Sequence, residues 1–145
     1  AASDVYKRQY LLDRKTFSED ALHNLEGEEI DLIVLAGFLS ILSKDFTEIW
    51  KNKMINIHPS LLPKFGGKGM YGAYVHKAVL EAKEKVSGAT VHYVTAEVDE
   101  GAIICQGEFQ VDENDQLEDL QRKVSEVEQR ILVEAVKKIS AQSSH

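Results

Sequence analysis

Residues 54–63 place the strongest constraint on how this chain can fold, because a short apolar segment is followed by two prolines. Met54–His58 is predicted to be a short β-strand that ends at Pro59, and apolar and polar side chains alternate over Ile55–His58. Successive side chains of a strand point to opposite faces, so Asn56 and His58 are expected to share one face. An amide and an imidazole would then lie side by side at the carboxyl end of a strand, where α/β sheets bind ligands.

The remaining segments complete an α/β pattern. Further strands are predicted at 31–36, 88–95 and 103–111, and helices at 17–26, 43–52, 74–84 and 116–140. Leu32–Ala36 is apolar without alternation, which is typical of a strand that is buried on both faces of a parallel sheet covered by helices. This succession predicts an α/β fold with a mostly parallel sheet flanked by helices. Residues 1–9 are interpreted as extraneous sequence, 10–140 as the domain and 141–145 as a tail.

Composition narrows the classes of function. The chain of 145 residues has a net charge of −7, which argues against a nucleic-acid-binding surface. Cys105 is the only cysteine, so we expect no disulfide within the chain and no cysteine-based zinc site. The longest apolar run has five residues, far short of a membrane span. These features favour a cytoplasmic protein without membrane or nucleic-acid partners, and without a bound metal.

Two acidic residues outside the strand at 54–58, Asp99 and Glu128, allow two interpretations each. Asp99 lies in an acidic loop, where it is either part of a solvated turn or a carboxylate that orients and charges His58. Glu128 falls on the apolar stripe of the last helix, either at its margin or directed at a polar ligand. His92 is interpreted as a hydrogen-bonded core histidine and Cys105 as a small buried hydrophobe. Taken singly, Asn56 and His58 also fit a turn residue and a capping histidine.

Taken together, the segments closely resemble the folate-dependent formyltransferases, and most of all their glycinamide ribonucleotide (GAR) branch. The resemblance runs from about Arg14 to Ile139, and its most specific part is Asn-Ile-His-Pro-Ser-Leu-Leu-Pro at 56–63. It is also carried by 31–42, 67–72, 88–95 and 98–101. It implies a Rossmann-like formyltransferase fold and a monomer or homodimer. The family's opening strands and its phosphate-binding loop have no counterpart in this sequence, so we expect the C-terminal two-thirds of such a domain.

Site residues follow from the resemblance by position. The catalytic residues would be Asn56, His58 and Asp99. The folate site would comprise Arg14, Leu39, Ser40, Ile41, Leu42, Asn56, Thr95, Ala96, Glu97, Val98 and Asp99, with Ser40 standing where many members have arginine. Glu128 and Ser125 would bind the acceptor substrate. The cosubstrate would be 10-formyltetrahydrofolate, and no metal would be required.

The implied reaction transfers a formyl group from 10-formyltetrahydrofolate to the amine of GAR in purine synthesis. The amine attacks directly and gives a tetrahedral intermediate, whose oxyanion Asn56 and protonated His58 would stabilise. Two alternatives remain open: a formyltetrahydrofolate hydrolase, in which water is the acceptor, and an inactive folate-binding fragment. Methionyl-tRNA formyltransferases are a further related class, but they need a tRNA-binding surface that an acidic chain lacks.

Overall fold

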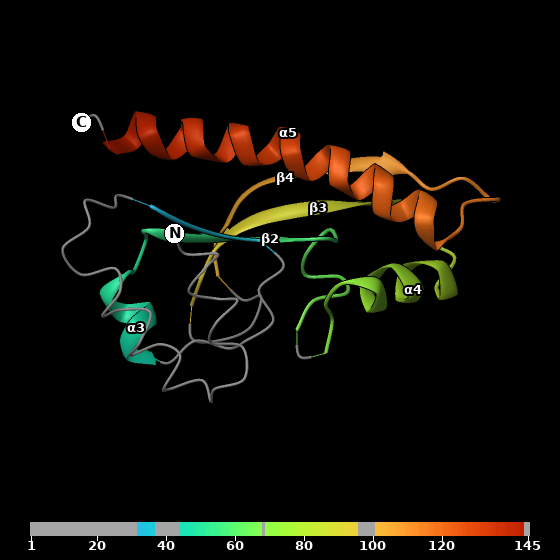
Figure 1. The fold of residues 1–145 in the computed structure, drawn as a ribbon, viewed down its shortest axis with the longest axis horizontal. Coiled ribbons are helices and arrows are strands. Elements are labelled where there is room, and N and C mark those ends of the chain that lie inside the picture. The colour runs from blue at the N-terminus through green and yellow to red at the C-terminus, as the bar shows by residue number, and fades with distance from the viewer. Residues whose placement is uncertain (1–31, 37–43, 68, 96–100, 144–145) are drawn as a thin grey trace.

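The computed structural model describes residues 32–36, 44–67, 69–95 and 101–143 (Figure 1). Their elements follow in the order β1 (Ile33–Ala36), α3 (Lys44–Ile49), β2 (Met54–His58), α4 (Ala73–Glu81), β3 (Val86–Tyr93), β4 (Ile103–Gln110) and α5 (Leu117–Ser143). The strand expected at 54–58 is thus confirmed to the residue, and the other described elements fall where the sequence predicts them, within a few residues. The helix expected at 17–26 lies outside the described residues.

The four described strands form one sheet in the order β1-β2-β3-β4. β1 and β2 are parallel, whereas the β2–β3 and β3–β4 pairs are antiparallel. The α/β class is confirmed, but the sheet is mixed over these strands rather than mostly parallel. Residues 94–102 are too short a link for a parallel crossover between β3 and β4, which takes a dozen residues or more.

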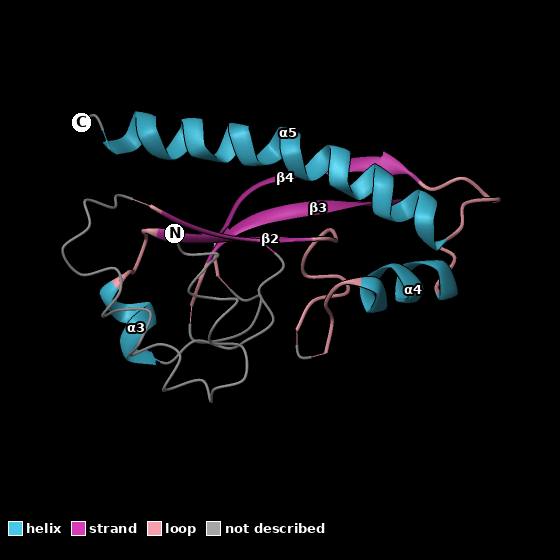
Figure 2. Cartoon of the chain, viewed as in Figure 1, coloured by secondary structure: helices cyan, strands magenta, loops and turns pink. Residues whose placement is uncertain are grey.

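α5 covers one face of this sheet and lies along β3 and β4 (Figure 2). Its apolar stripe supplies Val124, Val127, Ile131 and Ala135 to a core that the sheet completes with Ile55, Ile57, Ala89, Val91 and Cys105. All nine side chains are buried. Burial of this apolar surface is the main favourable contribution to folding here, and it confirms both the predicted stripe and the predicted burial of Cys105.

β1 departs from the prediction that its strand is buried on both faces. Ile33 is 4% exposed, but Val34 keeps 37% of its surface accessible. β1 is an edge strand of the described sheet, and an edge position gives a side chain fewer neighbours than a central one.

Two helices end earlier than the sequence pattern predicts, for a common backbone reason. The helix expected at 43–52 ends at Ile49, and the one expected at 74–84 ends at Glu81. Asn52 and Lys83 follow with φ of 64° and 53°. A residue in the left-handed region ends an α-helix, and nothing in the apolar spacing indicates where it will fall.

Candidate active site

The site is built on β2, whose alternation separates an apolar from a polar face. Ile55 and Ile57 face α5 in the core, so Asn56 and His58 point to the opposite face of the sheet. His58 is 4% exposed, and Asn56 is partly buried. The predicted pairing of an amide and an imidazole on one face of this strand is therefore confirmed.

A backbone carbonyl orients the ring of His58. Its Nε2 lies 2.8 Å from the carbonyl oxygen of Phe65, and only a protonated Nε2 can donate to that acceptor. With Nε2–H held in this bond, the nitrogen that gains or loses a proton on titration is Nδ1. The contact thus selects one tautomer of the neutral ring and remains intact in the charged ring.

Asn56 is oriented by a second histidine. Nδ1–H of His92 donates to the Tyr93 carbonyl at 2.9 Å, so Nε2 of the neutral ring is an acceptor. Nδ2 of Asn56 lies 3.3 Å from that Nε2 and donates to it. Oδ1 of Asn56 is buried and has no hydrogen-bond partner within the described residues. A buried acceptor without a donor is costly, so this oxygen is suited to accept an N–H or O–H from a ligand.

His92 is the buried, hydrogen-bonded histidine that the sequence predicts, being 3% exposed. Its contact with Asn56 was not predicted. The signal lies in the β2–β3 register, which sets Asn56 opposite His92 and His58 opposite Thr90. Side chains directly opposite each other on antiparallel strands are neighbours, but only the structure shows which strand pairs with which.

His76 is a further buried histidine that sequence reasoning did not connect with the site. It lies on α4, is 5% exposed, and its Nδ1 has no hydrogen-bond partner among the described residues. Burial lowers the pKa of His76, and the nearby ring of His58 lowers it further. The neutral form is therefore favoured at this position.

The two residues expected to bind the acceptor substrate come from α5, which packs on the other face of the sheet. Glu128 is half-buried, and burial raises the pKa of its carboxyl group. Ser125 is exposed. The hydrogen bonds given above for Asn56 and His58 go to His92 and Phe65, so the substrate-binding role of Glu128 and Ser125 stays a prediction. The partial burial of Glu128 is consistent with the position on the apolar stripe that the helical period predicts, and both interpretations of its side chain stay open.

Much of the expected folate site lies outside the described residues. This applies to Arg14, Leu39, Ser40, Ile41 and Leu42, and to Ala96, Glu97, Val98 and Asp99. Thr95 is described, is exposed and follows the end of β3. The pairing of Asp99 with His58 therefore remains a prediction.

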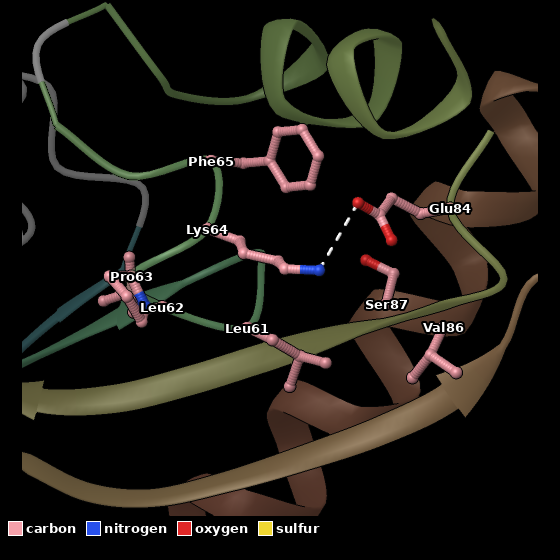
Figure 3. Close-up of a pocket in the computed structure, with 8 residues that line it drawn as sticks. All are labelled: Leu61, Leu62, Pro63, Lys64, Phe65, Glu84, Val86 and Ser87. Carbon is pink, nitrogen blue, oxygen red and sulfur yellow. Dashed lines mark ion pairs between the residues drawn. The ribbon is translucent and has the colours of Figure 1, made fainter. Parts of the chain in front are cut away.

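A cavity of about 300 Å³ lies beside the segment that follows β2 (Figure 3). Its lining comprises Leu61, Leu62, Pro63, Lys64, Phe65, Glu84, Val86 and Ser87. Lys64 and Glu84 form an ion pair across it, with Nζ and Oε1 3.5 Å apart. Neither Asn56 nor His58 lines this cavity, so it is separate from the polar face of β2.

The described residues offer neither a metal-binding cluster nor a membrane-spanning helix. No group of three or more His, Cys, Asp or Glu side chains in this part of the chain could hold a metal ion. Among its helices, none combines the length and the apolar character needed to cross a membrane.

Comparison with known proteins identifies the family. Residues 1–136 match the model of the formyl transferase family. A chloroplastic phosphoribosylglycinamide formyltransferase of Arabidopsis thaliana is 43% identical over 107 residues, which cover 74% of this chain and 37% of the relative.

Solved structures agree with this match. A phosphoribosylglycinamide formyltransferase from Anaplasma phagocytophilum superposes with a TM-score of 0.77 at 37% identity, over 86% of this chain and 58% of that one. A formyltetrahydrofolate deformylase from Pseudomonas syringae superposes with a TM-score of 0.75 at 31% identity, over 86% of this chain and 40% of that one. The chain thus spans less than two-thirds of the length of each of these three relatives. By sequence and by fold, it belongs to the formyl transferase family.

Proposed function

We propose that this chain carries the catalytic strand of an enzyme that transfers the formyl group of 10-formyltetrahydrofolate to the amine of GAR. The observation that carries the proposal is the pair Asn56 and His58, which share one face of β2 and are each oriented by a hydrogen bond. Preorganised donors of this kind stabilise charge that develops in a transition state. The GAR formyltransferases among the relatives support this choice of acceptor.

The reaction needs an amine nucleophile, an oxyanion site and one proton transfer. The GAR amine attacks the formyl carbon, and the carbonyl electrons move to oxygen as the tetrahedral intermediate forms. Nδ2–H of Asn56 and Nδ1–H of charged His58 donate to that oxygen in the proposed mechanism. Collapse re-forms the carbonyl, breaks the bond to N10 of the folate, and leaves the formyl group on the amine.

The Oδ1 of Asn56, which has no hydrogen-bond partner among the described residues, gives this residue a second role. It is a buried acceptor on the same group as the proposed oxyanion donor. An attacking amine has N–H groups to donate, whereas the oxyanion can only accept. We therefore assign Oδ1 to the amine and Nδ2–H to the oxygen, so that one carboxamide aligns nucleophile and electrophile.

The remaining site residues enter as proposals from the family resemblance. Asp99 would hold His58 in its charged form and carry the proton from the amine towards N10, with water as an intermediary. Arg14, Leu39–Leu42 and Thr95–Asp99 would bind the folate. Glu128 and Ser125 would contact GAR. A protein of this kind needs no nucleic-acid or membrane partner, and the cytoplasmic location remains an expectation.

A single assay separates the proposed function from its alternatives. The purified chain is incubated with 10-formyltetrahydrofolate, with and without GAR, and formyl-GAR, formate and tetrahydrofolate are quantified. Formyl-GAR that appears only with GAR supports the proposal. Formate released at the same rate without GAR contradicts it and supports a hydrolase, which the similarity to the deformylase structure makes the second candidate. If neither product forms, a calorimetric titration of the same sample with a stable 10-formyl folate analogue follows, and binding without either product supports an inactive fragment.

A further inference from the structure

Three residues form a row across the polar face of the sheet. His58 on β2 is opposite Thr90 on β3, and Thr90 is opposite Gln106 on β4. Their neighbours Ile57, Ala89, Val91 and Cys105 are buried in the core against α5. By the alternation of a strand, the row therefore faces away from α5, on the side of the sheet that carries Asn56.

Thr90 is the centre of a hydrogen-bond network that reaches from this row to the segment after β2. It is fully buried. Its Oγ1 donates to the Ser60 carbonyl at 2.7 Å and accepts from the backbone N–H of Leu62 at 3.1 Å. It also accepts from Nε2 of Gln106 at 3.0 Å. One donor and two acceptor positions are the full capacity of a hydroxyl group, so Thr90 is completely satisfied by this arrangement.

Gln106 closes the network from β4. Its Nε2 donates one hydrogen to Oγ1 of Thr90 and the other to the carbonyl oxygen of Leu62, at 2.9 Å. Gln106 is itself exposed, yet both N–H groups of its amide donate hydrogen bonds. Thr90 and Gln106 together, here called the clamp, hold both backbone polar groups of Leu62.

The held segment carries the acceptor for His58. Ser60 Oγ donates to the Lys64 carbonyl at 2.7 Å, and the next residue, Phe65, supplies the carbonyl that accepts from Nε2 of His58. Phe65 has a φ of 55°. A non-glycine residue in the left-handed region persists only where its surroundings hold it there. The clamp and the Ser60 bond supply that support at the base of the turn.

We propose that Gln106, acting with Thr90, is a positioning residue for His58, an inference that rests on the proposed function. The clamp keeps the 60–65 segment docked on β3 and β4, and the docked segment keeps the Phe65 carbonyl on Nε2. His58 is thereby maintained in one ring orientation, with Nδ1 as its titrating nitrogen. Groups behind a reacting side chain commonly orient it in this way.

The first test replaces Gln106 and reads the state of His58 directly. In Gln106→Ala and Gln106→Glu, the Leu62 carbonyl loses its amide donor. Long-range ¹H–¹⁵N spectra of the imidazoles, with His58 assigned through His58→Gln, should show a loss of the Nε2–H preference and faster exchange of that proton. The matched control is Gln110→Ala on the same strand, since Gln110 is exposed and makes no side-chain hydrogen bond within the described chain.

The second test is kinetic. Loss of the clamp should lower kcat by about two- to tenfold, the effect expected for one hydrogen bond. The KM for folate should be unchanged, because Gln106 orients His58 and is not assigned to the folate site.

Variants of Thr90 extend the spectroscopic test. Thr90→Ser keeps the hydroxyl group and should keep the wild-type His58 signals, whereas Thr90→Val should change them as Gln106→Ala does.

The outcomes decide the proposal in either direction. It is overturned if the His58 signals in Gln106→Ala match the wild type, or if Gln110→Ala changes them equally. Circular dichroism checks that each variant is folded, and Gln106→Glu repeats the test at nearly constant volume. If the wild-type chain transfers no formyl group, the proposed function fails, while the imidazole spectra still decide whether the clamp orients His58.

Discussion

Each of the two polar side chains on β2 takes its orientation from a group outside that strand. His58 is directed by the Phe65 carbonyl and Asn56 by the ring of His92. The His58 contact uses Nε2, whereas the proposed chemistry uses Nδ1. The Asn56 contact uses one hydrogen of Nδ2, and the proposed chemistry uses the other hydrogen and Oδ1. In the proposed mechanism these two oriented side chains account for much of the rate acceleration, because donors that are already in place need no reorganisation during the reaction.

Removing either donor should affect catalysis more than binding. We expect His58→Ala and Asn56→Ala each to lower kcat by about 10²–10³-fold, the usual loss for one oxyanion donor. The Kd for a stable 10-formyl folate analogue should stay within a few-fold for His58→Ala. Steady-state kinetics and calorimetric titration measure the two quantities.

Asn114→Ala is the matched control for the asparagine, because Asn114 is exposed in the loop before α5. Its turnover should equal that of the wild type. An unchanged kcat in His58→Ala would remove His58 from the mechanism.

At the scale of elements, the contact between β4 and α5 depends on the absence of a side chain at Gly107. A Cβ placed there would lie 2.7 Å from Cγ1 of Val127 and 2.8 Å from Cγ2 of Ile131. Both neighbours are β-branched and therefore have little rotamer freedom in a helix. The glycine thus sets how closely α5 can approach the sheet.

We expect Gly107→Ala to destabilise the fold by about 1–3 kcal/mol, the typical cost of overpacking a core. Chemical denaturation followed by circular dichroism measures the free energy of unfolding. Adding Val127→Ala should recover part of the loss, because the two sites share one space and their effects are not additive. Strictly additive effects in the double variant would show that the steric account is wrong.

Glu128 on α5 should reduce stability at neutral pH. Burial raises the pKa of its carboxyl group above the ordinary value of 4.5, so the folded state binds more protons than the unfolded state between the two pKa values. Stability is then lost as pH rises through that window. Glu128→Gln should raise the thermal midpoint at pH 7 and change it less at pH 4.

Glu126→Gln is the control for that comparison, since Glu126 is exposed on the same helix. It should leave both midpoints close to the wild type. Equal gains in the two variants would point to a general effect of net charge. A gain specific to Glu128→Gln would place a destabilising carboxylate at a predicted substrate contact, as is common at functional sites.

For the molecule as a whole, local pattern predicts the elements better than it predicts their neighbours. The alternation around Asn56 and His58 depends only on strand geometry, and the α5 stripe only on helical period, so both are confirmed. Direction and register are properties of pairs of strands. Nothing local indicates that His92 lies opposite Asn56, or that Gln106 reaches the segment after β2. The contacts that orient Asn56 and His58 therefore could not be predicted from the sequence.

His76 should make the stability of the whole fold sensitive to mild acid. Its folded-state pKa lies below the ordinary value of 6.5, first because of burial and then because of His58. The unfolded chain therefore binds more protons below about pH 6.5, and the free energy of unfolding falls as pH drops from there through the folded pKa. His76→Phe removes the titrating group while keeping a ring. The thermal midpoint of this variant should drop less between pH 7.5 and pH 5.5 than that of the wild type, as differential scanning calorimetry would measure. Parallel decreases in the two proteins would assign the acid sensitivity to other groups. A flatter profile in His76→Phe would mean that protonation of the buried His76 ring destabilises the fold in mild acid, first through its burial and then through the nearby His58.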